Sequence, residues 1–189
     1  MKNTLRLALA VLFCIVLCLG AGADAWAEGV AIDETNFPDQ NFRNYVSAKC
    51  DQDRDGTLSK SEIAATTEIY LYNRGIYSLK GIEYFTSLQR LGCEGNKLTT
   101  LNLSRNTALT SLSCNGNQLT NLDVSSNTAL TSLSCYNNQL TSLDVRGNTA
   151  LTSLYCSGNY LTSLDVSGNA ALTSLNCGNN QLTSLDVSH

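Results

Sequence analysis

Several residue types that mark common classes of protein are scarce in this sequence. There is one proline among 189 residues, which excludes collagen-like and proline-rich linker compositions. There is also one histidine, the last residue His189, and it leaves the many serines and the cysteines without a plausible general base. The sequence therefore favours a protein that is not an enzyme.

Positive charge is scarce as well. Lys and Arg number 12 against 16 Asp and Glu, for a formal net charge of −4. Nucleic acid is an improbable partner, because phosphate binding needs a basic stripe that this sequence does not contain. Hydrophobic residues make up 43% and charged residues 15%, which is an ordinary ratio for a folded, soluble chain.

No apolar run is long enough to cross a bilayer. The longest, residues 7–19, has thirteen residues, whereas a spanning helix needs about 20. Lys2 and Arg6 precede this run, and the small-residue signal Ala25-Trp26-Ala27 follows it. This is the pattern of a secretory signal peptide. The sequence predicts a leader at residues 1–27 and a chain that is secreted, either extracellular or on a cell surface.

A repeat of 21 residues organises the rest of the chain. Its copies read LTSLSCNGNQLTNLDVSSNTA from Leu109, LTSLSCYNNQLTSLDVRGNTA from Leu130 and LTSLYCSGNYLTSLDVSGNAA from Leu151. An earlier copy begins at Leu88, and a shortened one at Leu172. Each copy has two similar halves, L-x-x-L-x-C-x-x-N and L-x-x-L-x-V-x-x-N. Alternation in the L-x-C and L-x-V segments turns their apolar residues to one side.

Each copy should therefore form one coil of a solenoid. One coil cannot close a core alone, but coils stacked about 4.8 Å apart can, with parallel strands along the stack and turns or short strands on the return side. The six inward side chains of one coil are Leu109, Leu112, Cys114, Leu119, Leu122 and Val124. The asparagines that close each half-coil are interpreted as structural ladders that bond the turning backbone.

The repeat also carries the cysteines. We expect Cys93, Cys114, Cys135, Cys156 and Cys177 to be buried thiols, with disulfides between coils and metal binding as alternatives. The short C-x2-C spacings of metal sites are absent.

A twelve-residue acidic loop, DQDRDGTLSKSE, precedes the repeats at residues 51–62. It matches the EF-hand calcium loop, in which oxygen ligands at fixed positions surround the ion and a glycine at position 6 allows a sharp turn. Helices are expected on either side, at residues 39–49 and 59–67, the second with a Ser59–Glu62 capping box. The predicted calcium ligands are Asp51, Asp53, Asp55, the Thr57 carbonyl, Ser59 through a water, and Glu62.

EF-hands commonly occur in pairs, yet this sequence has a single loop. We therefore expect weak binding, with calcium in a structural role and the helix-loop-helix as a cap on the first coil.

The repeats resemble the bacterial leucine-rich repeat class with a nested half-repeat. The stretch NRGIYSLKGIEYFTSLQRL, residues 73–91, is similar to the atypical first repeat of internalin-type surface proteins. The resemblance implies a leucine-rich repeat solenoid of parallel β-structure with a small N-terminal helical cap, and ligands taken on the exposed strand face. The domains expected are the leader, a cap at 28–68, the atypical repeat at 69–87 and 21-residue repeats at 88–189.

The outward positions of the repeats carry the candidate functional residues. Tyr136, Tyr155 and Tyr160 are predicted to bind a ligand, because aromatic anchors on a polar face are typical of recognition sites. The leading hypothesis is thus a non-enzymatic binding module for an extracellular protein or glycan.

Alternative functions remain open at this point. One is a structural protein whose similar coils serve assembly. The last coil has no polar cap, which predicts either a truncated reading frame or end-to-end association. Another is an ice- or polysaccharide-binding solenoid that uses the threonine row. The aspartate row is predicted to form hydrogen-bonded turns, with a second cation site as the alternative. These rows are Thr110, Thr131, Thr152, Thr173, and Asp123, Asp144, Asp165, Asp186.

Overall fold

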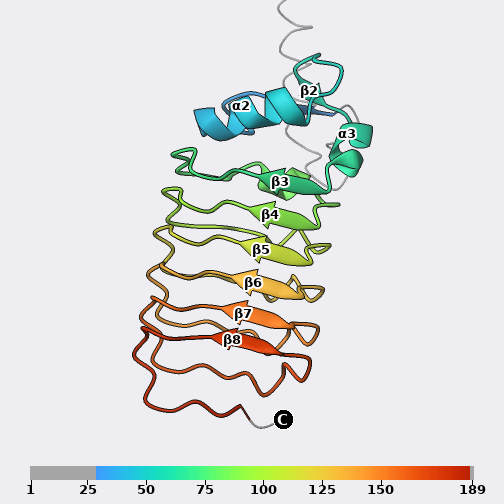
Figure 1. The fold of residues 1–189 in the computed structure, drawn as a ribbon. Helices are drawn as coiled ribbons and strands as arrows, with labels where there is room; N and C mark the ends of the chain where they lie inside the picture. Colours follow the sequence, from blue (N-terminus) through green and yellow to red (C-terminus); the bar gives the residue numbers. More distant parts are fainter. Residues whose placement is uncertain (1–28, 188–189) are drawn as a thin grey trace, which may run out of the picture.

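The computed structural model describes residues 29–187, so the predicted leader lies outside the described residues. Figure 1 shows a single stack of coils with two helices over its N-terminal end. This is the leucine-rich repeat solenoid with a helical cap that the repeat pattern predicts.

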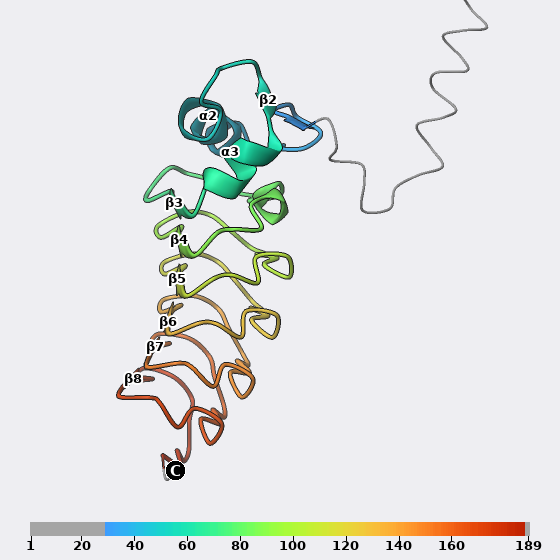
Figure 2. The ribbon, with the colours of Figure 1, turned by 90° about the vertical axis from the view of Figure 1, so that its right-hand side faces the viewer.

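A six-stranded parallel sheet runs along one side of the stack, as the turned view in Figure 2 shows. Each strand contributes three residues, with an apolar residue at the centre pointing inward. Paired residues in β5 to β8 are 21 positions apart, so the register equals the sequence repeat. The strands are β3 (Glu68–Tyr70), β4 (Arg90–Gly92), β5 (Ser111–Ser113), β6 (Ser132–Ser134), β7 (Ser153–Tyr155) and β8 (Ser174–Asn176).

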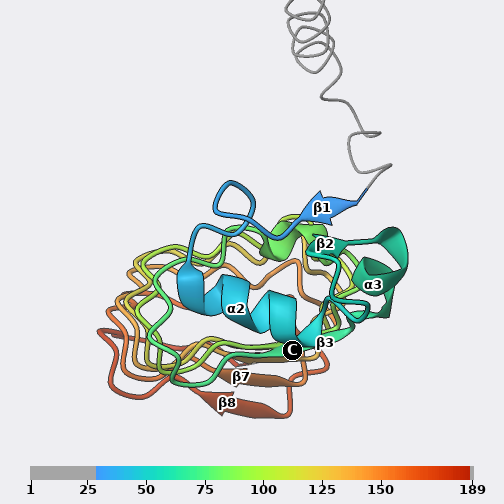
Figure 3. The same ribbon diagram turned by 90° about the horizontal axis from the view of Figure 1, so that it is seen from above.

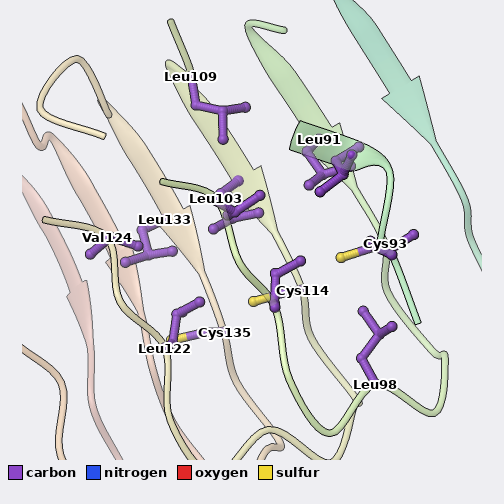
Figure 4. Close-up of a cluster of buried hydrophobic side chains, with 14 of the residues drawn as sticks. Leu91, Cys93, Leu98, Leu103, Leu109, Cys114, Leu122, Val124, Leu133 and Cys135 are labelled. Carbon is purple, nitrogen blue, oxygen red and sulfur yellow. The ribbon is translucent and has the colours of Figure 1, made fainter. Parts of the chain in front are cut away.

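The core is the inside of the coils. All six side chains predicted to point inward in the coil that starts at Leu109 are buried, each 3% exposed or less. Figure 4 shows the cysteine thiols of successive coils lying among these leucines. The five repeat cysteines are free thiols, of which only Cys177 in the last coil is partly exposed. The prediction of core thiols is confirmed, and the return side consists of turns, as expected.

Two rows of buried asparagines tie each coil to the one before it. In the first row, Asn138 donates through Nδ2 to the carbonyls of Cys114 and Cys135, and its Oδ1 accepts from the Leu119 amide. In the second row, Asn148 donates to the carbonyls of Val124 and Asn127. The first row satisfies backbone groups that the turns leave unpaired, and the second adds a second donor to carbonyls that already accept from backbone amides. The asparagines of both rows are therefore structural.

The cap begins with β1 (Val30–Ala31), which pairs antiparallel with β2 (Thr57–Leu58). Helix α2 (Gln40–Lys49) starts at the N-cap Asp39, and α3 (Lys60–Ala65) starts at Ser59 with the predicted capping box. The one-turn 3-10 helix η1 (Ile82–Tyr84) lies in the atypical first repeat. Viewed along the stack in Figure 3, α2 lies across the end of the coils.

The cap is packed and pinned onto the first coil. Phe37, Phe42 and Val46 are fully buried in the same core as the repeats. The Asp39 carboxylate caps α2 through Oδ1, and through Oδ2 it accepts from the backbone amides of Tyr77 and Ser78 in the first repeat. The cap thereby covers apolar surface that would otherwise face water at this end of the solenoid.

Candidate functional site

Three aspartates of the acidic loop converge. Asp51, Asp53 and Asp55 each place a carboxylate oxygen within 4.8 Å of the others. Asp51 is 5% exposed, and its Oδ1 is buried without a hydrogen-bond partner, while its Oδ2 accepts from the Gly56 amide. A buried carboxylate oxygen without a partner is costly unless a cation or a water completes it. This cluster suits a hard cation such as calcium.

The local electrostatics agree with that view. The Asp55 amide donates to Asp53 and lowers its pKa, yet burial and the carboxylates of Asp55 and Glu62 leave the pKa of Asp53 raised overall. Gathered negative charge of this kind makes a cation favourable. Gly56 has φ +84°, the conformation that the sharp turn at loop position 6 requires.

The last predicted ligands have other partners in the structure. Ser59 caps α3, and its hydroxyl donates to the Glu62 Oε2 at 2.8 Å. Glu62 also accepts from the amides of Ser59 and Gln52, so that its carboxylate closes the loop on itself. Burial raises the pKa of Glu62, but these bonds outweigh it and hold the pKa below its usual value. Thr57 lies in β2, and its amide donates to Asp55 Oδ1. The structure thus brings together the carboxylates of three of the six predicted residues, Asp51, Asp53 and Asp55.

The tyrosines predicted to bind a ligand divide into a pair and a single residue. Tyr155 lies on the outward face of β7 opposite Ser134, and Tyr136 follows Ser134 by two residues, so the two rings occupy adjacent coils of one face. They are 37% and 40% exposed. Tyr160 comes after the turn at Gly158, on the other side of the coil corner.

A second pair of aromatic residues lies at the N-terminal end of the same face, and the sequence analysis missed it. Tyr70 of β3 and Tyr72 stack with ring centroids 5.6 Å apart. The Tyr72 ring lies over Gly92, where a Cβ would come within 2.8 Å of it. The only signal in the sequence is the alternation Tyr-Leu-Tyr, which stands outside the regular repeats. Tyr70 also donates to Glu68, which pairs with Arg90.

Small residues, most of them polar, form the surface of the strand face between the two tyrosine pairs, which we call the floor. Asn115 is buried and hydrogen-bonded to these residues. Its Nδ2 donates to the Ser113 hydroxyl, and its Oδ1 accepts from the Ser134 hydroxyl and the Tyr136 amide. The tyrosines therefore stand above an ordered hydroxyl surface. The floor consists of Gly92, Ser111, Ser113, Ser132, Ser134 and Asn115.

The aspartate row forms hydrogen-bonded turns, as predicted. Asp123 accepts from the Ser125 amide, and Asp165 from the amide and hydroxyl of Ser167. The Arg146 guanidinium beside Asp144 lowers the pKa of that carboxyl to about 2. The threonine row also has partners within the stack: the Thr131 hydroxyl donates to the Thr110 carbonyl, and the bond recurs from coil to coil.

Comparisons with known proteins agree with this geometry. Residues 107–148 and 149–189 match the family model described as leucine-rich repeats in two copies. Internalin J from two strains of Listeria monocytogenes is 46% identical over 71 residues, which are 38% of this chain and 8% of the relative. The chain thus spans a small part of these curated relatives.

Solved structures extend the likeness to most of the chain. The functional domain of InlJ from Listeria monocytogenes, described as including a cysteine ladder, is 44% identical with a TM-score of 0.79, covering 85% of this chain and 36% of that one. An internalin, inlF, from the same species is 22% identical with a TM-score of 0.78, covering 85% of this chain and 49% of that one, and shows the fold alone.

Fold, repeat and comparisons together define a leucine-rich repeat solenoid. The chain is similar to the internalins, and like the InlJ domain it contains a column of stacked cysteines. Among residues 29–187, no helix combines the length and the apolar character that a bilayer crossing requires.

Proposed function

We propose that this chain is a secreted or surface-associated, non-enzymatic binding module that recognises an extracellular protein or glycan on its strand face. The observation that carries the proposal is the exposed pair Tyr136 and Tyr155 on an ordered serine floor. Tyrosine offers a large, rigid contact area with a hydroxyl at its tip, so it is enriched in recognition surfaces. The leader pattern at residues 1–27 supports export.

Neighbouring coils supply the substitutions that test this site. The position of Tyr155 holds serine in β5 and β6, and that of Tyr136 holds Asn115 one coil earlier. The double variant Tyr136→Asn/Tyr155→Ser therefore keeps residues that the solenoid already accommodates. With a partner isolated from host-surface or biofilm extracts, we expect its affinity to fall more than about tenfold, measured by biolayer interferometry.

The matched control is Tyr160→Gln, because Gln118, Gln139 and Gln181 occupy the same position in other coils. It changes a tyrosine that is 52% exposed and lies around the corner from the strand face. Unchanged affinity in this variant would confine the binding site to the strand face. Full affinity in the double variant would show that this pair does not form the binding site.

We also propose that the acidic loop holds a structural calcium ion. The carboxylates of Asp51, Asp53 and Asp55 would hold it together with the Thr57 carbonyl, while Ser59 and Glu62 fix the loop around the site. Support comes from the converging carboxylates and the unpartnered Asp51 Oδ1. A bound cation would offset the mutual repulsion of the three carboxylates and clamp the loop.

A calorimetric calcium titration of residues 28–189 tests this proposal. A single extracellular loop should bind at about 10⁻⁴ to 10⁻³ M. Ion at 100 times the dissociation constant should stabilise the fold by about 2.7 kcal/mol, seen as a higher melting temperature than in chelator. Asp53→Asn should weaken both effects. Absence of heat and of a melting shift at 10 mM calcium would reject the calcium site.

Apolar side chains exposed near residue 187 favour self-association of residues 28–189 as a second candidate function. Leu185 and Val187 are 37% and 56% exposed, and Leu172, Leu175 and Leu182 are only partly buried. The opposite end of the stack is covered by the cap, which blocks head-to-tail stacking. Association through the last coil would therefore join two chains tail to tail rather than build a filament.

A further inference from the structure

The lone cation loop has an unexpected neighbour in the structure. EF-hands commonly occur in pairs, and a second acidic loop is absent from this sequence. In its place, β1 (Val30–Ala31) pairs with β2 (Thr57–Leu58), which lies at positions 7 and 8 of the loop. The Ile32 amide extends this ladder by donating to the carbonyl of Gly56, at position 6, at 2.9 Å.

The register of this ladder decides which way the loop backbone faces. In an antiparallel pair, residues that exchange hydrogen bonds alternate with residues that do not. Because Ile32 bonds to Gly56, the pair Ala31 and Thr57 falls at a position without bonds between the strands. The backbone groups of Thr57 thus face away from β1, and its amide donates to Asp55 Oδ1 at 2.7 Å. At a position without bonds between antiparallel strands, the amide and the carbonyl of a residue face the same side, so this register assigns the Thr57 carbonyl to the side of its amide.

Close packing at the start of β1 requires a glycine. Gly29 has φ +96°, and a Cβ on it would lie 2.7 Å from Thr57 Cγ2 and 2.9 Å from the Leu58 carbonyl oxygen. Any larger residue would push β1 away from the loop. Val30 and Leu58, which face each other across the pair, are 4% and 0% exposed, so the strand is packed as well as hydrogen-bonded.

The other edge of β1 is held by the solenoid. Asn36 donates through Nδ2 to the Ala31 carbonyl at 2.9 Å. The Oδ1 of Asn36 accepts from the hydroxyl of Tyr84, which lies in η1 of the first repeat, at 2.8 Å. The chain of contacts runs from the cation loop through β1 and Asn36 to the repeats.

We propose that β1 replaces the second EF-hand, and that residues 29–32 are positioning residues for the cation. The strand directs Thr57 into the site, and Asn36 and Tyr84 hold the strand in place. Cation affinity in this chain is then set by the N-terminal segment and its attachment to the first repeat. This inference rests on the calcium binding proposed above.

Calcium titrations of three variants of residues 28–189 test the inference. Gly29→Ala should weaken calcium binding about tenfold, because the loop loses its preorganised backbone. Asn36→Ala, at a partly exposed position, should weaken it about threefold with the fold retained. The control is Gly75→Ala, which also replaces a glycine of positive φ but meets no atom closer than 3.9 Å, and should bind calcium as the parent does.

Each outcome decides between the proposals. Wild-type affinity in Gly29→Ala and Asn36→Ala, with cooperative melting in both, would overturn the role of β1 and leave the calcium site standing. If Gly29→Ala does not fold, the calcium affinity of Asn36→Ala alone tests the role of β1, because that variant leaves the residues of β1, β2 and the core unchanged. A parent chain that binds no calcium would reject the site itself, and this inference with it.

Discussion

The two asparagine rows show how much one side chain can do in this fold. Asn138 donates to three backbone carbonyls and Asn148 to two, but only Asn138 also accepts from a backbone amide. The Oδ1 of Asn148 is buried and lacks a hydrogen-bond partner. The two positions look alike in sequence, and the structure makes them different in energy.

We therefore predict that Asn138→Ala destabilises the fold more than Asn148→Ala. The first change leaves the buried Leu119 amide without its acceptor, whereas the carbonyls bonded by either asparagine keep a second donor. The second change leaves no backbone group unpaired and removes an unsatisfied oxygen. At about 1–3 kcal/mol for each buried polar group left without a partner, the difference should be at least about 1 kcal/mol. Urea unfolding of the two variants measures it, and equal losses would contradict the assignment of bonds.

At the scale of elements, the aspartate turns carry the pH dependence. The side chain and amide of Ser125 lower the pKa of Asp123, and those of Ser167 lower the pKa of Asp165. Arg146 lowers the pKa of Asp144 to about 2. A carboxyl whose pKa is lower in the folded chain stabilises the fold above its unfolded pKa of about 3.9, and loses that contribution as the pH falls through the folded pKa.

The solenoid should accordingly lose stability between about pH 4 and pH 2. Replacing all three aspartates with asparagine should flatten this dependence, because Asn102 makes the same turn with its amide oxygen and the Ser104 amide. Urea midpoints measured from pH 6 to pH 2 for the parent and the triple variant test this. An equally steep acid loss in the triple variant would place the responsible carboxyls elsewhere.

The same scale shows what the sequence could predict. The repeats were predictable because Leu, Cys, Val and Asn recur in phase, and an error in register would expose the whole core. Helix α2 was predictable from Pro38 and the apolar spacing after Asp39. Strand β1 was not predictable, because two residues have no periodicity and their partners are distant in sequence. Val30 pairs with Leu58, 28 positions away, and Ala31 with Thr57, 26 positions away.

The candidate sites also divide into features set by local sequence spacing and features set by contacts between distant segments. The three aspartates are set by local spacing within one loop, so the sequence alone placed them together. Glu62 was predicted as a ligand, but its capping bonds to Ser59 and Gln52 depend on how α3 meets the loop. Tyr70 and Tyr72 fall outside the regular repeat, and only the pairing of β3 with β4 puts them on the strand face.

At the scale of the whole solenoid of residues 29–187, the two ends of the stack differ. One end is covered by α2 and packed aromatic residues, and the other leaves Leu185 and Val187 exposed. We expect residues 28–189 to form a dimer at high concentration and no larger species, by sedimentation velocity. Leu185→Ser/Val187→Ser should shift the equilibrium to monomer. A concentration-dependent series of longer oligomers would contradict the tail-to-tail arrangement.

The side-chain donors of the two asparagine rows and of the threonine row all point one way, since each donates to carbonyls of its own coil or of the coil before it. Each coil therefore carries the side-chain donors that bond it to the preceding coil, and it presents equivalent carbonyls to the following coil. Duplicating one 21-residue block of the gene would insert a coil whose joints are already correct on both sides. Duplication or deletion can therefore change the length of such a solenoid by whole coils, while the contacts between coils stay the same.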